Sequence, residues 1–166
     1  MGVCGAGKTS VGRTLATRLG ARYIEADDFH PPDNRRAMEQ GVPLTDEMRQ
    51  PWLMALSVAA EQARQEGTVV MACSALKRRY RELLRANIGS VRFIFLHADR
   101  DVIAQRMSQR TGHFMPVTLL DSQIATLEPP APDEDALAVN VARPKAEIDD
   151  IVERHARAEA TRTAPC

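Results

Sequence analysis

The most informative stretch of the sequence is GVCGAGKT, residues 2–9. It consists of a glycine, four further residues, a second glycine, a lysine and a threonine, which is the pattern of a phosphate-binding loop. Its glycines allow consecutive backbone N–H groups to converge on phosphate oxygens, and the N-terminus of the following helix adds positive potential. The spacing predicts that Lys8 reaches the β- and γ-phosphates of a nucleotide and that the Thr9 hydroxyl binds Mg²⁺.

The sequence after this loop has the expected helical pattern, but the sequence before it lacks the expected strand. After it, Val11, Leu15 and Leu19 recur at helical spacing and Gly20 follows as a C-terminal cap, which predicts a helix over about 8–19. Before it stands only Met1, although such a loop normally leaves a buried strand. Either that strand is missing, or the first residue of this chain is not the natural start.

Apolar segments and helical patterns alternate along the rest of the chain. The run TVVMACSA at 68–75 is continuous and apolar, as in a parallel strand that is covered on both faces. This alternation predicts an α/β fold with three layers, a parallel sheet between helices on both faces. Strands are expected at about 22–24, 68–75, 91–98 and 136–142, and helices at about 33–40, 51–66, 77–85, from Asp99 or Asp101 onward, 117–127 and 144–158.

The composition fits a single domain over 1–166, with a lid region near 106–118 and a frayed tail near 160–166. Lys and Arg together number 22, as do Asp and Glu, so no net charge favours nucleic acid or an anionic membrane as a partner. Three cysteines without close spacing indicate neither a disulfide framework nor a zinc site. With no signal peptide or membrane-spanning run, we expect a cytoplasmic protein.

Carboxylates follow the expected strand at 22–24. Glu25 and Asp27 are two residues apart, so they share a face if the strand end is extended. One of them could hold Mg²⁺ while the other accepts the proton of a substrate hydroxyl. The alternative is that both are ordinary solvated charges of a loop.

A pair of arginines precedes the expected lid. Arg106 and Arg110 lie four residues apart on one helix face, just before Gly112. They are either a solvated basic face or the guanidinium groups that a closing lid brings onto the transferred phosphoryl group.

Read together, several strings resemble the gluconokinase family, small bacterial-type enzymes that phosphorylate D-gluconate. These strings are MGVCGAGKT, ADDFHPPDN, GVPLTDEMRQPWL, CSALKRRYRELLR, GHFMP and LLDSQIATLEPP, and they span nearly the whole chain. The resemblance implies a fold like that of nucleoside monophosphate kinases and shikimate kinase. It also implies ATP with Mg²⁺ as the phosphoryl donor, 6-phosphogluconate as the product, and a homodimer.

The resemblance assigns roles to particular residues. Lys8, Asp27 and Arg110 would be catalytic, with Asp27 orienting or deprotonating the 6-hydroxyl, and Thr9 and Glu25 would hold Mg²⁺. The residues expected to bind ATP are Gly2, Val3, Cys4, Gly5, Ala6, Gly7, Lys8, Thr9, Arg106 and Arg110. Those expected to bind the substrate are Asp27, His30, Arg49, Lys77, Arg81 and His113. A cation among them suits the carboxylate of an acid sugar, but spacing does not select which one.

The resemblance also makes the strand before the loop the central one of the sheet. Its absence would leave two neighbouring strands with unpaired groups and an apolar slot unfilled, and we expect the natural protein to be longer at its front. Two other functions stay open: a kinase of another small hydroxy acid such as shikimate, and a nucleotide-binding protein without turnover.

Overall fold

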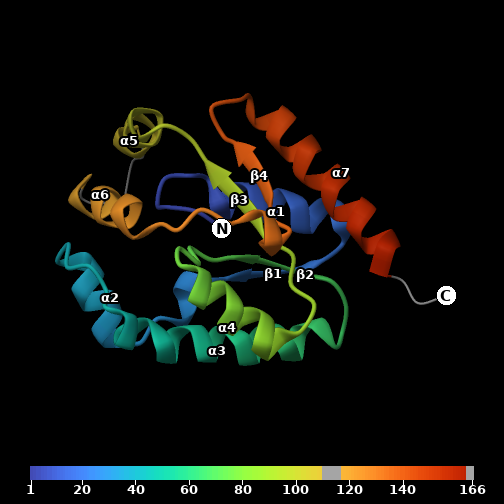
Figure 1. Ribbon diagram of the computed structural model, residues 1–166, viewed down its shortest axis with the longest axis horizontal. Helices are drawn as coiled ribbons and strands as arrows, with labels where there is room; N and C mark the ends of the chain where they lie inside the picture. The colour runs from blue at the N-terminus through green and yellow to red at the C-terminus, as the bar shows by residue number, and fades with distance from the viewer. Residues whose placement is uncertain (110–116, 164–166) are drawn as a thin grey trace.

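The computed structural model describes residues 1–109 and 117–163 (Figure 1). Parallel strands alternate with helices, as the sequence predicts. The helices are α1 (Lys8–Leu19), α2 (Pro32–Glu39), α3 (Asp46–Arg64), α4 (Arg78–Ile88), α5 (Arg100–Ser108), α6 (Val117–Thr126) and α7 (Lys145–Thr163), with short 3₁₀ turns η1 (Ala26–Phe29) and η2 (Pro132–Glu134). The strands are β1 (Arg22–Glu25), β2 (Val69–Ala72), β3 (Ile94–His97) and β4 (Leu137–Asn140).

Three helix boundaries differ from the prediction by three or more residues, among them the end of α4, which continues to Ile88. Helix α3 begins at Asp46, well before Pro51, because the Thr45 hydroxyl accepts a hydrogen bond from the Met48 N–H at 3.3 Å and caps the helix. Helix α7 continues to Thr163, beyond the predicted end near residue 158. At the start of α5, Asp99 occupies the N-cap position, but its side chain makes no capping hydrogen bond.

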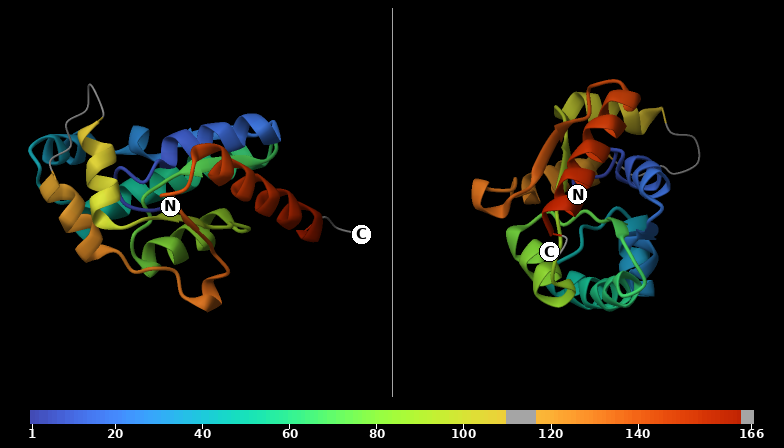
Figure 2. Two further views of the ribbon diagram at one scale, coloured as in Figure 1. Left: turned by 90° about the horizontal axis from the view of Figure 1, so that it is seen from above. Right: turned by 90° about the vertical axis from the view of Figure 1, so that its right-hand side faces the viewer.

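The predicted parallel sheet with helices on both faces is confirmed, but it is divided into two pairs of strands. β1 pairs with β2 and β3 pairs with β4, both in parallel. Helices α3 and α4 lie side by side on the face away from α7, which packs with α1 (Figures 1 and 2). Successive side chains of β3 alternate accordingly: Phe95 belongs to the core under α3 and α4, and Leu96 to the core under α1 and α7.

The N-terminus lies between the two pairs (Figure 1). The Met1 amine donates to the Ile94 carbonyl at 2.5 Å, and the Met1 carbonyl accepts from the Leu96 N–H at 2.9 Å. On the other side, the Gly2 N–H donates to the Ser74 carbonyl at 3.1 Å. Residues 1 and 2 therefore join β3 to the end of β2.

Strand β2 is only half-buried over three of its four residues, so the prediction of a strand covered on both faces is wrong for these residues.

None of the helices in the described part of the chain has the length and hydropathy needed to span a membrane.

Candidate active site

The phosphate-binding loop has the backbone that its glycines predict. Gly7, the N-cap of α1, has a left-handed φ of 88°, and the helix begins at Lys8. Gly2 has a φ of 138°, and a Cβ there would lie 2.4 Å from the Leu96 carbonyl oxygen. Only glycine fits this close approach between two backbones. The N-terminus of α1 thus faces the loop with N–H groups that suit an anion.

Lys8 folds back over the loop. Its Nζ donates to the Val3 carbonyl at 2.9 Å. Burial lowers the pKa of Lys8 below its ordinary value, and the nearby carboxylate of Asp27 partly offsets that shift. A phosphate group bound in the loop would place a negative charge directly beside the Lys8 amine, which now has carboxylates only at a distance.

Thr9 and Glu25 place two oxygen ligands beside the loop. The Thr9 hydroxyl donates to Glu25 Oε2 at 2.9 Å, and the Tyr23 hydroxyl donates to the same oxygen at 2.6 Å. Burial, followed by the bond to Glu25, raises the pKa of Tyr23. Hydroxyl and carboxylate oxygens are the hard ligands that Mg²⁺ prefers, so these residues fit that ion. Across residues 1–109 and 117–163, no cluster of three or more His, Cys, Asp or Glu side chains forms a metal site by itself.

A cavity of about 60 Å³ brings several predicted site residues together. Lys8, Asp27, His30 and Arg49 line it, on the loop, η1, the segment after η1 and α3. The remaining lining residues are Cys4, Met38, Val42, Pro43, Leu44, Ser74, Leu119, Ser122 and Gln123. A much larger cavity lies between the two pairs of strands, but it contains none of the chemistry-bearing residues predicted from the sequence. Chemistry, rather than size, therefore identifies the small cavity as the candidate active site.

His30 is held as a neutral ring. It stacks on Trp52 with a centroid distance of 4.1 Å, and its side chain is 3% exposed. Burial, followed by the charges of Arg49 and Arg35, lowers the pKa of His30 to about 4. The Asn34 amide nitrogen lies 3.3 Å from Nδ1. Because an amide NH₂ group can only donate, Nδ1 is the acceptor and the proton is on Nε2.

Asp27 lies at the open side of this arrangement. His30 Nε2 is 3.9 Å from Asp27 Oδ1, and the Asp27 side chain is 74% exposed. Its carboxylate is therefore reachable from solvent and from the cavity. The start of η1 is fixed by the Trp52 indole, which donates to the Ala26 carbonyl at 2.7 Å.

Arg49 is a buried cation of the cavity wall. Its Nε donates to the Leu44 carbonyl at 3.4 Å, and its guanidinium carbon lies 5.9 Å from the Tyr80 ring centroid. Burial lowers the pKa of Arg49 below its ordinary value. A buried guanidinium of this kind gains strongly from a carboxylate partner.

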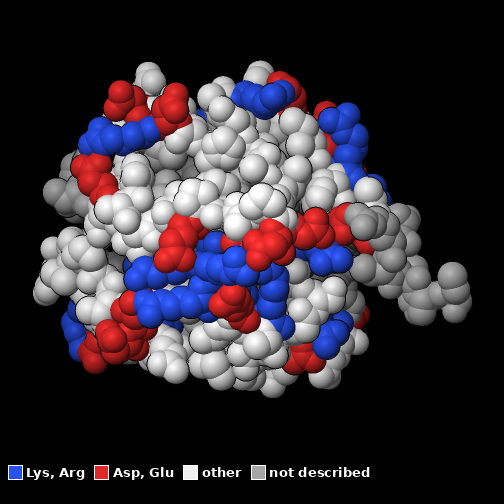
Figure 3. Space-filling model, viewed as in Figure 1, with Lys and Arg blue, Asp and Glu red and all other residues white. Residues whose placement is uncertain are grey.

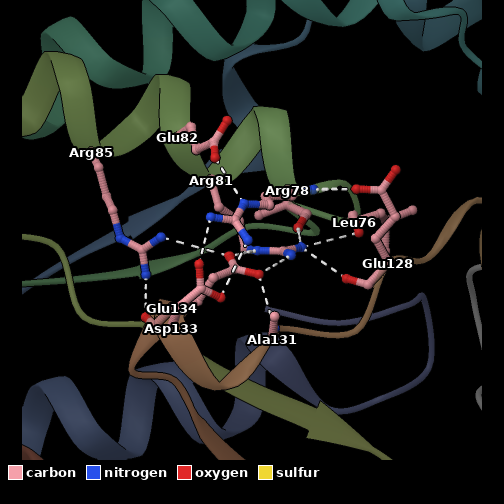
Figure 4. Close-up of polar contacts among 10 residues, drawn as sticks. Leu76, Arg78, Arg81, Glu82, Arg85, Glu128, Ala131, Asp133 and Glu134 are labelled. Carbon is pink, nitrogen blue, oxygen red and sulfur yellow. Dashed lines mark hydrogen bonds and ion pairs between the residues drawn. The ribbon is translucent and has the colours of Figure 1, made fainter.

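Arg81 is not brought to this cavity. Its side chain is fully buried and forms a two-point ion pair with Glu134, at 2.5 Å from Nε and 2.7 Å from Nη2 (Figure 4). Its Nη1 donates to the carbonyls of Ala75, Leu76 and Glu128 at 3.2, 3.2 and 3.0 Å. Every nitrogen of this guanidinium is committed within the protein, which favours a structural role for Arg81.

Other predicted cations also lie away from the small cavity. Lys77 pairs with Asp46 at 3.0 Å, and Arg106 donates to the Val141 carbonyl. Arg110 and His113 lie outside the described residues. On the face that carries α4, basic side chains form a band bordered by acidic ones (Figure 3). Several of these are paired, including Arg78 with Asp133 at 2.8 Å.

Gln123 is a site residue that the analysis of the sequence did not single out. Its Oε1 accepts a hydrogen bond from the Cys4 N–H at 2.7 Å, so α6 contacts the phosphate-binding loop directly. Cys4 and Gln123 are 119 residues apart, and no local pattern connects them. The only signal was that Gln123 belongs to the string LLDSQIATLEPP.

Comparison with known proteins agrees with this geometry. The family model described as shikimate kinase matches residues 4–131. A gluconokinase from Gluconobacter oxydans is 44% identical over 161 residues, covering 96% of this chain and 90% of that protein. The thermosensitive gluconokinase of Escherichia coli is 46% identical over 135 residues, covering 81% and 72%. The chain belongs to the gluconokinase family.

A solved structure supports the same assignment. The crystal structure of a gluconokinase from Sinorhizobium meliloti superposes with a TM-score of 0.85 and 45% identity, covering 99% of this chain and 95% of that one. The resemblance that the strings predicted is thus confirmed, and this gluconokinase family member is a kinase with a shikimate kinase-like fold.

Proposed function

We propose that this protein transfers the γ-phosphoryl group of ATP to the 6-hydroxyl of D-gluconate. The observation that carries the proposal is one cavity that joins the phosphate-binding lysine, Lys8, to a carboxylate, Asp27, and a buried guanidinium, Arg49. A sugar acid needs partners for a phosphate, a reacting hydroxyl and a carboxylate, and these three side chains supply them. The names of the gluconokinase relatives support this choice of substrate.

Phosphoryl transfer of this kind depends mainly on positioning and charge neutralisation. Loop N–H groups and Lys8 would hold the β- and γ-phosphates. Thr9 and Glu25 would hold Mg²⁺, which neutralises charge on the phosphate oxygens when it is bound. Arg106 and Arg110 stay candidates for nucleotide contacts on the lid side.

Asp27 is our candidate for the residue that orients the 6-hydroxyl and accepts its proton. The carboxylate is accessible, and His30 Nε2, 3.9 Å from Asp27 Oδ1, would come within hydrogen-bond distance after a small side-chain movement. Because His30 is neutral, it does not cancel the charge of Asp27.

Arg49 is our candidate for the group that binds the gluconate carboxylate. Of the three cations considered from the sequence, Arg81 forms an ion pair with Glu134 and Lys77 forms one with Asp46, whereas Arg49 lines the cavity. A charge-assisted contact from Arg49 would favour an acid sugar over neutral glucose.

The small cavity has to widen before this substrate can enter. Its volume of about 60 Å³ corresponds to roughly two water molecules at about 30 Å³ each. The side of the cavity formed by α6 is held to the loop by the Gln123 bond to Cys4. We infer that substrate entry displaces α6 and breaks this bond.

We also propose that the kinase acts as a homodimer in the cytoplasm. Met54 and Val58 lie four residues apart on α3 and are 40% and 54% exposed, an apolar pair that suits a protein contact. Light scattering of the wild type and of Val58→Lys tests the dimer: a monomeric wild type would contradict it.

A panel of acceptors tests the reaction itself. ADP release coupled to a dehydrogenase assay is measured with D-gluconate, shikimate and D-glucose at equal concentrations. We expect turnover with gluconate alone. Turnover of shikimate without gluconate would replace the proposed substrate, and ATP binding without ADP release would point to a nucleotide-binding protein.

A further inference from the structure

Gly12 is a buried glycine in the interior of α1, where alanine would favour the helix more. Its φ does not lie in the left-handed region, so the helix backbone does not require glycine here. A Cβ at this position would lie 2.9 Å from Tyr23 Cε2 and 3.8 Å from the Ala72 Cβ. The lack of a side chain at Gly12 therefore allows the Tyr23 ring to lie directly against α1.

Two pairs of residues face each other across this contact. Thr9 and Gly12 are three residues apart on one face of α1, and Tyr23 and Glu25 are two residues apart on one face of β1. Ile24, which lies between them in the strand, belongs to the core on the side of α3 and α4. With its ring on Gly12, Tyr23 extends its hydroxyl to the Glu25 carboxylate beside Thr9.

The Glu25 carboxylate accepts two hydrogen bonds on one oxygen. The Tyr23 hydroxyl lies 2.6 Å and the Thr9 hydroxyl 2.9 Å from Oε2. An ionised carboxylate can only accept, so both hydroxyls are donors. The described residues place no hydrogen-bond donor on Oε1. This second oxygen is therefore free for a cation or for a water molecule bound to one.

A second residue of α1 also contacts the Tyr23 ring. The Arg13 guanidinium carbon lies 5.4 Å from the ring centroid, within the range of a cation–π interaction. Tyr23 is only half-buried, so contacts with the consecutive residues Gly12 and Arg13 fix its ring more than deep burial does. A ring held for packing alone would need no hydroxyl.

We propose that Tyr23 is a positioning residue of the magnesium site, which orients Glu25 toward the ion, and that Gly12 allows the Tyr23 ring to reach this position. The proposal rests on the assignment of Thr9 and Glu25 to Mg²⁺ in the proposed function. By fixing Oε2, the phenol limits the rotation of the carboxylate and keeps Oε1 free for the ion. Loss of a hydrogen bond to a metal-ligating group typically lowers metal affinity by about 10- to 100-fold.

The affinity for Mn²⁺ in the presence of a non-hydrolysable ATP analogue tests the proposal without turnover. Electron paramagnetic resonance measures the free Mn²⁺. Tyr23→Phe removes the hydroxyl and keeps the ring. Its matched control is Tyr80→Phe, which removes the hydroxyl that the other tyrosine of the chain donates to the carboxylate of Asp46. Gly12→Ala keeps the Tyr23 hydroxyl but displaces the ring, and Gly12→Ala/Tyr23→Phe completes a double-mutant cycle.

We expect Tyr23→Phe to weaken Mn²⁺ binding by about 10-fold and Tyr80→Phe by less than about twofold. Gly12→Ala should weaken it by about threefold or more in the wild type but by less than about twofold in Tyr23→Phe, because no hydroxyl is then left to displace. Equal Mn²⁺ affinities for the wild type and Tyr23→Phe would overturn the proposal, and so would additive effects of the two substitutions. If Gly12→Ala does not fold, the two tyrosine variants decide alone.

The same measurement separates this proposal from the proposed function. A wild type that binds the nucleotide but no Mn²⁺ would contradict the assignment of Thr9 and Glu25 to the ion, and the role of Tyr23 with it. Tight Mn²⁺ binding that is unchanged in Tyr23→Phe would overturn the role of Tyr23 alone.

Discussion

Replacing Arg81 by methionine should destabilise the protein strongly, because it breaks a fully buried ion pair. The change keeps most of the side-chain volume but leaves the Glu134 carboxylate with only the more distant Arg85 guanidinium, at 3.6 Å. It also removes a donor from three carbonyls, of which that of Leu76 keeps the hydrogen bond from the Glu128 N–H. The hydrogen bond with Arg81 is the main reason why the pKa of Glu134 is lowered to about 2 from 4.5. At about 1.4 kcal/mol per pKa unit, this shift corresponds to about 3–4 kcal/mol, within the roughly 3–5 kcal/mol measured when one partner of a buried pair is removed.

For a domain of this size, that loss corresponds to a fall in melting temperature of roughly 6–20 °C. The matched control is Arg78→Met, whose side chain is 45% exposed and pairs with Glu82 and Asp133. These two exposed pairs are worth about 0–1 kcal/mol each, so the control should lose less than about 8 °C. Calorimetry measures both variants, and equal shifts would refute the reasoning.

The same pair predicts an acid transition. Because the folded pKa of Glu134 is below its unfolded value, its stabilising contribution is complete above pH 4.5 and is lost as the pH falls toward 2. Urea unfolding of Arg81→Met should lack this part of the pH dependence. Gluconate KM provides a further check on the role of Arg81: at a temperature where the variant is folded, a structural residue leaves KM within about threefold, whereas a substrate clamp would raise it by 10-fold or more.

Three further predictions concern the cavity. Arg49→Met should raise the KM for gluconate by roughly 10- to 100-fold and leave the KM for ATP nearly unchanged, because a charge-assisted hydrogen bond is worth about 1.5–3 kcal/mol; an unchanged gluconate KM in steady-state kinetics would contradict it. Gln123→Ala should lower the melting temperature by about 2–4 °C without nucleotide, because the Cys4 N–H loses its acceptor. If a phosphate oxygen of ATP accepts from the Cys4 N–H instead, the difference in melting temperature from the wild type should shrink with ATP. A difference that persists at saturating ATP would count against the contact between Cys4 and phosphate. Burial lowers the pKa of His30 to about 4 from 6.5, so the unfolded state binds more protons between these values and the free energy of unfolding should fall as the pH drops from 6.5 to 4. In His30→Gln, urea unfolding should show a weaker dependence of this free energy on pH. An equal pH dependence in both proteins would argue against the buried neutral ring.

Local sequence patterns predicted the elements well because their causes are local. The α1 helix has the predicted bounds, since its glycine N-cap and the Gly20 C-cap lie in the sequence next to its ends. The start of α3 was misplaced because Pro51 suits a first helical turn, whereas the cap that acts is the Thr45 hydroxyl.

The sequence could not predict contacts between residues that lie far apart along the chain. Arg81 was a substrate candidate by its string, but its partner Glu134 is 53 residues away and no spacing rule links them. The Gln123 contact with Cys4 is of the same kind. The half-burial of β2 depends on the space beside it, and an apolar run cannot tell whether that space is filled.

The role of Asp27 is the most direct test of the proposed reaction. Formation of 6-phosphogluconate from ATP and gluconate is followed by ³¹P NMR for the wild type, Asp27→Asn and Asp28→Asn, with ATP affinity measured by calorimetry. Asp28 is the matched control because it is the next residue along η1 and does not line the cavity. We predict that Asp27→Asn lowers kcat by about 100-fold or more with unchanged ATP affinity, while Asp28→Asn stays within about threefold of the wild type. No phosphogluconate from the wild type, or equal rates for both variants, would contradict the account.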